Sequence, residues 1–382
     1  MNGRIAVMGG FGGGNLGDEL IGLAETGFLD AKGIEALCYS FDPAVSQEIQ
    51  PDVRWLDYRD FPDYFQRLRN IVRRHSLRKG QPLPDRVIIG AGGLLYDTPL
   101  THLIGWHSRT LYLRKQQIPY ALFANSLRRP KSNLGRYLLR NVLRYASSVS
   151  LRDQLSLDIA RELYHRDDYR LTRDPVLTLG KVLRPTRQAP VQQGLVGVAP
   201  RPWGPSGEHQ GLSFWRKVLT GIMQRGLEPV LVAFDPRMDV EFCQRLGDSL
   251  KLGDVRSWDL TQGLAGAGAV FDGCEMVFGM RFHALILALL LEKPMLAFSY
   301  DEKVTGLMSD LGLSSLCHTL DGNDRTALEF VDYGCRYLKE KRSEVLTGMR
   351  RYVLESANLT TEDFAGIVDS SPNVKNHKNC GS

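Results

Sequence analysis

The 382-residue chain is long enough for two domains of ordinary size, each with its own hydrophobic core. Its composition, 43% apolar and 24% charged, excludes a disordered chain, and no apolar run reaches the length of a membrane span. The net charge of +5 is uneven, because residues 1–190 carry 28 lysines and arginines against 19 carboxylates, whereas residues 191–382 carry 20 against 24.

The chain begins directly with a predicted strand at residues 4–8, without the apolar region of a secretory signal peptide. The six cysteines are scattered and lack metal-ligand spacing, so we expect free thiols in a reducing compartment rather than zinc or a disulfide framework. Together these features predict a cytoplasmic protein.

A glycine-rich stretch, GGFGGGNLGDEL at 9–20, follows this strand and leads into a helix predicted over 18–32. Its glycines at 12, 14 and 17 match the G-x-G-x-x-G spacing of dinucleotide-binding loops. Asp18 and Glu19 then follow directly, where they would repel a bound pyrophosphate. Asp18 is also well placed to complement the dipole of its own helix. The stretch is therefore either a nucleotide site or a glycine loop that serves other chemistry.

The rest of the first half alternates apolar runs with helical stretches. Strands are predicted at 36–41, 86–90, 120–124 and 148–151, and helices at 102–116, 134–145 and 154–164. The strand at 86–90 opens into a second glycine loop, GAGG at 90–93. Such alternation predicts right-handed crossovers and a parallel sheet with helices on both faces.

Two basic stretches, 66–80 and 126–146, account for most of the excess of positive over negative charge in the first half. In the second, Arg136, Arg140 and Arg144 recur every four residues beside an apolar face, which predicts an amphipathic helix with a basic stripe. We interpret the stripe either as a solvated helix face or as a surface for anionic phospholipid or a pyrophosphate-bearing substrate. Nucleic acid is not expected, because these stretches contain few aromatic side chains.

A linker is predicted at 181–193, after which the alternation restarts. Strands are predicted at 194–200, 228–234, 276–279 and 294–300, helices at 213–225, 282–291 and 326–356, and a flexible tail from Ser370. The expected fold class is α/β, with two doubly wound Rossmann-like domains that face a cleft and bind ligands beyond the carboxyl ends of their strands. The predicted divisions are an N-terminal α/β domain over 1–185, a C-terminal α/β domain over 190–345, and a final helix and tail over 346–382.

Arginines follow two of the predicted strands. Arg152 comes after the strand at 148–151 and is either an anion ligand or part of a surface pair or helix cap with Asp153. Arg201 lies between two prolines after the strand at 194–200, which fixes its direction and suits recognition of carboxylate or phosphate. An ordinary surface arginine is the alternative interpretation of this residue.

The stretch FGMRFHALILALLLEKPMLAFSYDEKV at 278–304 is the most informative part of the chain. Arg281 and His283 begin a very apolar, and therefore buried, helix. A cation at a helix N-terminus is unfavourable by roughly 0.3–1 kcal/mol, so this placement favours an anion that both side chains and the helix N–H groups bind together. The alternative is a core histidine beside a surface arginine. Lys303 follows the next strand and is a further candidate for the same site.

Six motifs, in this order, resemble those of the polysaccharide pyruvyl transferases: FGGGNLGDEL, IIGAGGLLYD, RDQLS, GVAPRPW, GMRFHALILALL and PMLAFSYDEKV. The resemblance runs from about residue 4 to about residue 315, and the GMRFHALI block followed by YDEKV is its most specific part. It implies an architecture similar to the B-type glycosyltransferases. It also implies transfer of pyruvate from phosphoenolpyruvate onto a sugar of a cell-surface polysaccharide or its lipid-linked precursor, as a ketal, with release of phosphate. The stretch FANSLRRP at 123–130 departs from a glycine-containing segment of many relatives.

The resemblance further implies roles for the residues of these loops. His283 would be the general acid that protonates the methylene carbon of phosphoenolpyruvate. The charges of this donor would be bound by Arg281, Arg201, Arg152 and Lys303. Asp18 would orient or deprotonate the acceptor hydroxyl, and the acceptor would also contact Asn15, Gly13, Gly14, Gly92 and Gly93. Phosphoenolpyruvate is a co-substrate, and neither a cofactor nor a metal is expected, because arginines carry the charge and no D-x-D motif is present.

Two other functions remain open. One is a B-type glycosyltransferase with a nucleotide-sugar donor, for which Glu302 is the candidate ribose ligand. The other is a non-catalytic glycan- or anion-binding protein with the same fold. Because acceptors in this class of pathway are often lipid-linked, we also expect peripheral contact of 66–80 and 126–146 with the inner face of the cell membrane.

Overall fold

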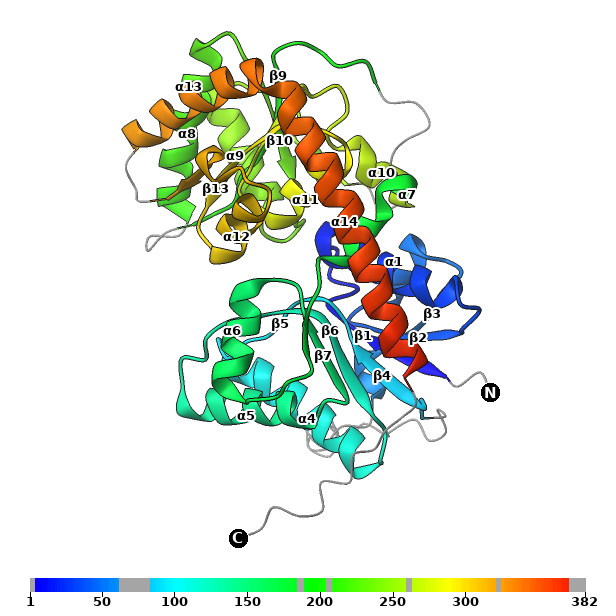
Figure 1. The fold of residues 1–382 in the computed structure, drawn as a ribbon. Coiled ribbons are helices and arrows are strands. Elements are labelled where there is room, and N and C mark those ends of the chain that lie inside the picture. The colour runs from blue at the N-terminus through cyan, green and yellow to red at the C-terminus, as the bar shows by residue number, and fades with distance from the viewer. Residues whose placement is uncertain are drawn as a thin grey trace. The chain divides into compact units, whose positions relative to one another are not determined.

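The computed structural model describes residues 4–61, 83–183, 189–203, 208–258, 263–320 and 324–370. The chain divides into two compact units (Figure 1). Unit 1 is formed by Met1–Gly13, Asp18–Pro175 and Ala357–Ser382, and unit 2 by Gly14–Gly17 and Val176–Ser356. The basic stretch at 66–80, part of the predicted linker and the predicted tail beyond Ser370 lie outside the described residues.

Unit 1 is built on an eight-stranded sheet. Its strands are β1 (Ile5–Met8), β2 (Ala36–Ser40), β3 (Arg54–Asp57), β4 (Arg86–Ile89), β5 (Gly92–Leu95), β6 (Tyr120–Leu127), β7 (Ser148–Leu151) and β8 (Tyr169–Leu171). The order is β3-β2-β1-β4-β6-β7-β8, with β5 paired to β6, and the pairings are parallel. The helices are α1 (Leu16–Asp30), α2 (Pro43–Ile49), α4 (Leu100–Lys115), α5 (Asn133–Tyr145) and α6 (Gln154–Leu163).

Helices cover both faces of this sheet, which is why its central strands β1, β4 and β6 are almost entirely buried. Figure 1 shows α4, α5 and α6 together along one side of the strands. The amphipathic pattern of α5 places Leu139 and Val142 in the core on that side. On the other side Phe123 of β6 packs against Phe28 of α1 and Phe364 of α14 (Arg342–Asp369), with ring centroids 6.3 and 4.9 Å away.

Unit 2 is built on a six-stranded sheet. Its strands are β9 (Leu195–Ala199), β10 (Glu228–Ala233), β11 (Arg256–Ser257), β12 (Met276–Gly279), β13 (Met295–Ser299) and β14 (Cys317–Thr319). The order is β11-β10-β9-β12-β13-β14, again with parallel pairings. The helices are α7 (Gly180–Leu183), α8 (Glu208–Gln224), α9 (Val240–Leu250), α10 (Gly263–Ala269), α11 (Phe282–Leu290), α12 (Glu302–Asp310), α13 (Asp324–Glu340) and the first part of α14.

The α/β fold with parallel sheets is confirmed. The single helix predicted at 326–356 is instead two helices, α13 and α14, and the second continues to Asp369. Neither glycine nor proline marks the break at Lys341, so the pattern gave no sign of it. None of the helices formed by the described residues is long and apolar enough to cross a membrane.

Candidate active site

The sheet of unit 2 has a topological switch point between its neighbouring strands β9 and β12. From β9 the chain continues to β10 on one side, and from β12 it continues to β13 on the other. In open parallel sheets, ligands bind outside the carboxyl ends of the strands at such a point. The loops there carry Arg201 after β9, Arg281 and His283 after β12, and Tyr300 after β13. The topology therefore brings the predicted donor residues of unit 2 to one edge.

Arg201 is oriented by Tyr300. One terminal nitrogen of its guanidinium donates to the Tyr300 hydroxyl, and the guanidinium carbon lies 4.5 Å from the centroid of the same ring. Tyr300 is also close enough to Arg281 to act electrostatically on its pKa. The tyrosine thus contacts one of the predicted anion ligands and lies near a second. Its role beside Arg201 was not recognised from the sequence, although its position at the end of a predicted strand was a usable signal.

Arg281 is the N-cap residue of α11, and its carbonyl accepts from Ala284 and Leu285. Its side chain, 12% exposed, donates to Asp239 and lies 4.0 Å from a carboxylate oxygen of Asp235. Burial by itself would lower the pKa of Arg281, but the Asp239 carboxylate raises it overall, so the guanidinium stays charged.

Asp239 is fully buried and is itself fixed by the backbone. Its second carboxylate oxygen accepts from the N–H groups of Phe234 and Asp235, at 3.2 and 3.0 Å. These residues form the turn that follows β10, the strand beside β9. Sequence reasoning missed both aspartates, and only the position of Asp235 at the end of a predicted strand pointed to this edge.

Residues 14–17 of the first glycine loop belong to unit 2 and contact the same turn. Leu16 donates its N–H to the Phe234 carbonyl, and the Asn15 side chain donates to Asp235 at 3.3 Å and accepts from the Gly17 N–H at 3.0 Å. A Cβ on Gly17 would overlap the imidazole of His283. Glycine is therefore required at the start of α1, beside the predicted general acid.

Lys303 lies near Phe282, the first residue of α11. Its ammonium nitrogen is 5.8 Å from the ring centroid of Phe282, which is 5.4 Å from the ring of His283. Asp301, the N-cap of α12, accepts from the Lys303 N–H and lies 3.9 Å from its ammonium group. The strand-end loops of unit 2 thus carry Arg201, Arg281 and His283 at one sheet edge, with Asn15 hydrogen-bonded to Asp235 and Lys303 near Phe282.

Asp18 stands in unit 1, at the switch point between β1 and β4. A Cβ on Gly10 would lie 3.0 Å from its carboxyl carbon, and one on Gly92 would lie 3.8 Å from a carboxylate oxygen. The two glycine loops therefore converge on Asp18. Glu19 has a structural task instead, because it is buried and accepts from the Gly12 N–H at 2.9 Å.

The other predicted acceptor contacts are glycines of these two loops. Gly13 and Gly93 have open surroundings, with nothing closer than 3.6 Å to a Cβ on Gly13 and nothing within 4 Å of one on Gly93. Gly14 has a φ of +73°, a conformation that favours glycine, and belongs to unit 2. The backbone at Gly13 and Gly93 is therefore open to close approach by a ligand.

Arg152 has a different environment from the other predicted donor ligands. It is buried in unit 1, where its guanidinium donates to Asp174 and, at 2.6 Å, to the hydroxyl of Ser126. Asp153 is the N-cap of α6 and accepts from the Ser156 N–H at 2.8 Å. The cap interpretation therefore holds for Asp153, and the guanidinium of Arg152 has an internal partner that neutralises it.

The fold resembles that of several solved structures. A glycosyltransferase from Rickettsia africae ESF-5 is 12% identical, with a TM-score of 0.63 over 96% of this chain and 99% of that one. HepE of Anabaena, in complex with UDP and glucose, is 14% identical, with a TM-score of 0.61 over 97% of this chain and 100% of that one. The UDP-GlcNAc 2-epimerase of Neisseria meningitidis, bound to UDP-GlcNAc, is 12% identical, with a TM-score of 0.62 over 96% of this chain and 100% of that one. These likenesses establish the fold, which is that of B-type glycosyltransferases and related epimerases.

One family pattern also matches the chain. It is described as polysaccharide pyruvyl transferase and covers residues 15–302, from Asn15 through Arg201, Arg281 and His283 to the start of α12. The match spans well over half of the chain and includes the switch-point loops of unit 2. The protein therefore belongs to the polysaccharide pyruvyl transferase family.

Proposed function

We propose that this protein transfers pyruvate from phosphoenolpyruvate onto a sugar of a cell-surface polysaccharide or its lipid-linked precursor, forming a ketal and releasing phosphate. Its family makes it a transferase of polysaccharide biosynthesis. The observation that carries the proposal is the group of cationic side chains beside His283 at the switch point of unit 2. These cations are Arg201, Arg281 and Lys303.

The charge of phosphoenolpyruvate suits this group. Its phosphate carries about two negative charges and its carboxylate one, and arginine binds both kinds of oxygen through parallel N–H donors. Within the part of the chain that the structure describes, the Nε atoms of Arg201 and Arg281 are buried and have no hydrogen-bond partner. Buried donors normally have a hydrogen-bond acceptor, so a bound anion would supply the acceptor that both Nε–H groups lack. Arg152 is omitted from the proposed donor site because Asp174 already holds its guanidinium in unit 1.

The chemistry follows from a proton donor beside this anion site. His283 donates a proton to the methylene carbon, which becomes a methyl group and leaves an oxocarbenium-like centre at the adjacent carbon. A sugar hydroxyl attacks that centre, the C–O bond to phosphate breaks, and a second hydroxyl forms the other C–O bond of the ketal. One hydroxyl proton restores His283 and the other leaves with phosphate, so atoms and charge balance.

The acceptor hydroxyl is assigned to Asp18 in unit 1. The two glycine loops converge on this carboxylate, and Gly13 and Gly93 in these loops have open surroundings, so a ligand can approach the backbone there closely. A carboxylate is the group required to orient a hydroxyl or to accept its proton. Asn15 lies in unit 2 beside Asp235 and Gly17, so we now assign it to the support of His283 rather than to the acceptor.

Phosphate release from phosphoenolpyruvate in the presence of glycan acceptors tests the proposal, with mass spectrometry of the product for a ketal. His283→Gln is expected to lower turnover at least about 100-fold, the usual contribution of a general acid. The exposed His165→Gln is the matched control and is expected to keep full activity. Turnover of His283→Gln within a few-fold of the wild type would exclude the proposed acid.

A nucleotide-sugar donor is the competing function, because the solved structures of similar fold include glycosyltransferases. Thermal shift separates the two donors, since a ligand that binds the folded state raises the melting temperature. We expect phosphoenolpyruvate to stabilise the protein and UDP to leave it unchanged. Stabilisation by UDP alone would favour the glycosyltransferase. Arg281→Lys, which loses the paired donor geometry, should weaken the effect of phosphoenolpyruvate.

We also propose that α5 contacts an anionic membrane surface. Arg136 and Arg140 are exposed on this helix, together with the large apolar side chains of Leu134 and Tyr137, which are 48% and 61% exposed. Cations mixed with exposed aromatic and aliphatic groups are typical of interfacial helices. Glu162 lies 3.4 Å from Arg136 and offsets part of the charge. Such a contact would hold the enzyme near a lipid-linked acceptor at the inner face of the membrane.

Binding to vesicles with and without phosphatidylserine tests this contact. Arg136→Glu/Arg140→Glu is expected to abolish binding to the anionic vesicles at low salt. The control, Arg336→Glu/Arg351→Glu, makes the same charge change at exposed positions of unit 2 and should retain it. Equal binding of both variants, or none by the wild type, would show that α5 does not serve as the membrane contact.

A further inference from the structure

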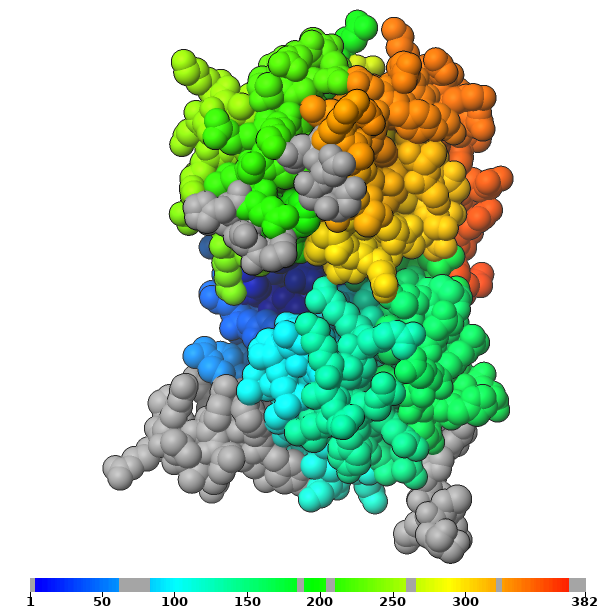
Figure 2. All heavy atoms as spheres, turned by 90° about the vertical axis from the view of Figure 1, so that its left-hand side faces the viewer, coloured from blue at the N-terminus to red at the C-terminus, as the bar shows by residue number. Residues whose placement is uncertain are grey.

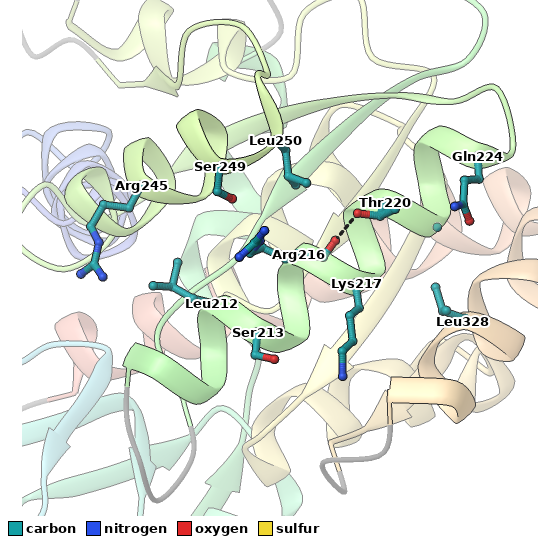
Figure 3. Close-up of a pocket in the computed structure, with 11 residues that line it drawn as sticks. Leu212, Ser213, Arg216, Lys217, Thr220, Gln224, Arg245, Ser249, Leu250 and Leu328 are labelled. Atoms are coloured by element: carbon teal, nitrogen blue, oxygen red, sulfur yellow. Dashed lines mark hydrogen bonds between the residues drawn. The ribbon is translucent and has the colours of Figure 1, made fainter.

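A basic groove of about 740 Å³ opens along the outer surface of α8 in unit 2 (Figure 3). Arg216 and Lys217 of α8 and Arg245 of α9 line it, and none of the described residues that line it is acidic. All three cations are exposed. In the space-filling view, α13 (orange) lies beside α8 (green) on this surface (Figure 2). The groove contains none of the residues assigned to the proposed chemistry, which in unit 2 follow β9, β12 and β13.

The lining follows the helical repeat of α8 over most of its length. Lys217, Gly221 and Gln224 form one row, and Leu328 of α13 packs on the bare backbone of Gly221. The lining extends from Leu212 to Gln224, which corresponds to about 18 Å at 1.5 Å per residue. A groove of this length fits an extended chain with several polar groups better than one compact ion.

The side chains of the groove match an acidic saccharide. Arginine and lysine bind carboxylate or phosphate, and the hydroxyls of Ser213, Thr220 and Ser249 can bind sugar hydroxyls. Thr220 donates to the Arg216 carbonyl at 2.7 Å, which leaves its oxygen as an acceptor directed by the helix. We propose that this groove binds an acidic glycan chain, with its carboxylate or phosphate groups on Arg216, Lys217 and Arg245.

A membrane surface fits this groove less well than a single chain does. Its aliphatic lining residues, Leu212, Leu250 and Leu328, are all half-buried. Interfacial surfaces instead present exposed apolar side chains for insertion among lipids, as Leu134 and Tyr137 do on α5. A concave groove also admits one chain but not a plane of headgroups. The two basic surfaces therefore suit different partners.

The position of the groove connects it with the proposed donor site, and this step rests on the proposed function. The helix α8 follows β9, so it begins at the sheet edge where Arg201 lies. A Cβ on Gly211 would lie 3.2 Å from the backbone nitrogen of Trp203, so the first turns of α8 pack closely against that segment. A glycan along α8 would therefore lead from the outer surface of unit 2 to its switch point. The acceptor class would be an acidic polysaccharide.

Calorimetric titration of the full chain with a size-defined oligogalacturonate tests the proposal. We expect the wild type to bind it and to ignore a neutral dextran oligosaccharide of equal length. Arg216→Glu/Arg245→Glu should raise the dissociation constant at least about tenfold at low salt, because two attractions become repulsions. Arg336→Glu/Arg351→Glu is the matched control for net charge and should bind as the wild type does.

The outcomes are distinguishable from failure of the proposed function. With a short neutral acceptor, the groove variant should release phosphate from phosphoenolpyruvate at the wild-type rate, since no groove residue is part of the proposed chemistry. Absence of phosphate release by the wild type with both acidic and neutral acceptors would overturn the enzyme assignment and leave glycan binding standing. Equal affinity of both variants for oligogalacturonate, or no affinity of the wild type for it, would overturn the proposal that the groove binds an acidic glycan. Loss of binding to anionic vesicles through Arg216→Glu/Arg245→Glu would identify a membrane as its occupant instead.

Discussion

A buried carboxylate beside a proposed anion site needs a reason, because its charge opposes the ligand. Asp239 is fully buried, accepts from two backbone N–H groups and receives a hydrogen bond from Arg281. Arginine recognises phosphate and carboxylate through a fixed planar geometry, and small displacements of such a group are costly. We therefore interpret Asp239 as a positioning residue that fixes Arg281 at the price of some repulsion.

The first prediction tests whether Asp239 acts mainly by positioning Arg281 or mainly by repelling the anionic ligand. Asp239→Asn removes the charge that holds Arg281, and the guanidinium is then drawn toward Asp235, 4.0 Å away. We expect the KM for phosphoenolpyruvate to rise about tenfold or more, with kcat changed only a few-fold. Asp332→Asn, which removes the partner of Arg225 elsewhere in unit 2, should change neither constant. A lower KM for Asp239→Asn would mean that repulsion, not positioning, dominates.

The second prediction concerns Gly17 and the proposed acid. Alanine at this position would force the imidazole of His283 to move, because the added methyl group overlaps the ring. A misplaced proton donor affects the chemical step, so kcat should fall about 100-fold while the KM for phosphoenolpyruvate stays close to that of the wild type. Gly306→Ala is the control, since nothing lies within 4 Å of its added methyl group. Steady-state phosphate release would give both constants. An unchanged kcat would show that His283 takes no part in the chemical step.

At the scale of elements, one buried side chain ties α1 to the second glycine loop. Glu25 of α1 is fully buried, accepts from the Ala91 N–H at 2.6 Å and fills the space where Gly90 lacks a side chain. Burial raises the pKa of Glu25 to about 8. The carboxyl is therefore protonated in the folded state at pH values where it is ionised in the unfolded chain.

The third prediction follows from this difference. The protonated carboxyl contributes stability that is fully present below about pH 4.5, the ordinary value of the group, and that is lost as the pH rises through about 8. The wild type should therefore lose several degrees of melting temperature between pH 5 and pH 8.5, about 2–4 °C for each kcal/mol. Glu25→Gln, which stays neutral, should lose less, whereas the exposed Glu48→Gln should behave as the wild type. Identical pH profiles for all three proteins would show that Glu25 does not ionise in this range.

The sequence predicted the longer elements because their patterns were periodic. The amphipathic repeat predicted a helix at 134–145, and the structure has α5 at Asn133–Tyr145. The short strands β3, β8 and β14 were missed because charged or polar residues interrupt their apolar runs, whereas β1 and β4, which are as short, contain the continuous apolar runs that predicted them. The end of α14 was also beyond sequence reasoning, since only tertiary packing of Phe364 on Phe28 and Phe123 assigns it to unit 1.

The candidate site was predictable where it depended on topology. Alternating strands and helices imply a parallel sheet, and its carboxyl edge then gathers Arg201, Arg281 and Lys303. The supporting residues were not predictable, because Asp239 and Tyr300 owe their roles to side-chain contacts formed only on folding. The ion pair of Arg152 with Asp174 was not predictable either, because the two residues lie 22 positions apart and meet only on folding.

At the scale of the whole molecule, the first glycine loop is divided between the two units. Residues up to Gly13 and from Asp18 onward belong to unit 1, whereas 14–17 belong to unit 2. Asp18, the carboxylate that would repel a bound pyrophosphate, thus lies at the switch point of the sheet of unit 1. Gly17 lies against His283 of unit 2. Neither segment of the glycine loop needs a bound pyrophosphate to explain its glycines.

The fourth prediction uses this division. If the donor binds unit 2 alone, phosphoenolpyruvate without acceptor should slow hydrogen exchange in the segments that follow β9, β12 and β13, which contain Arg201, Arg281 and Tyr300. His283→Gln should keep this protection, because it removes the acid and leaves the proposed arginine ligands in place, whereas Arg281→Lys should weaken it. Segments 9–13 and 90–93 of unit 1 should exchange as in the unliganded protein. Protection that appears first in those glycine loops would place the donor on Asp18 and reverse the proposed assignment of donor and acceptor.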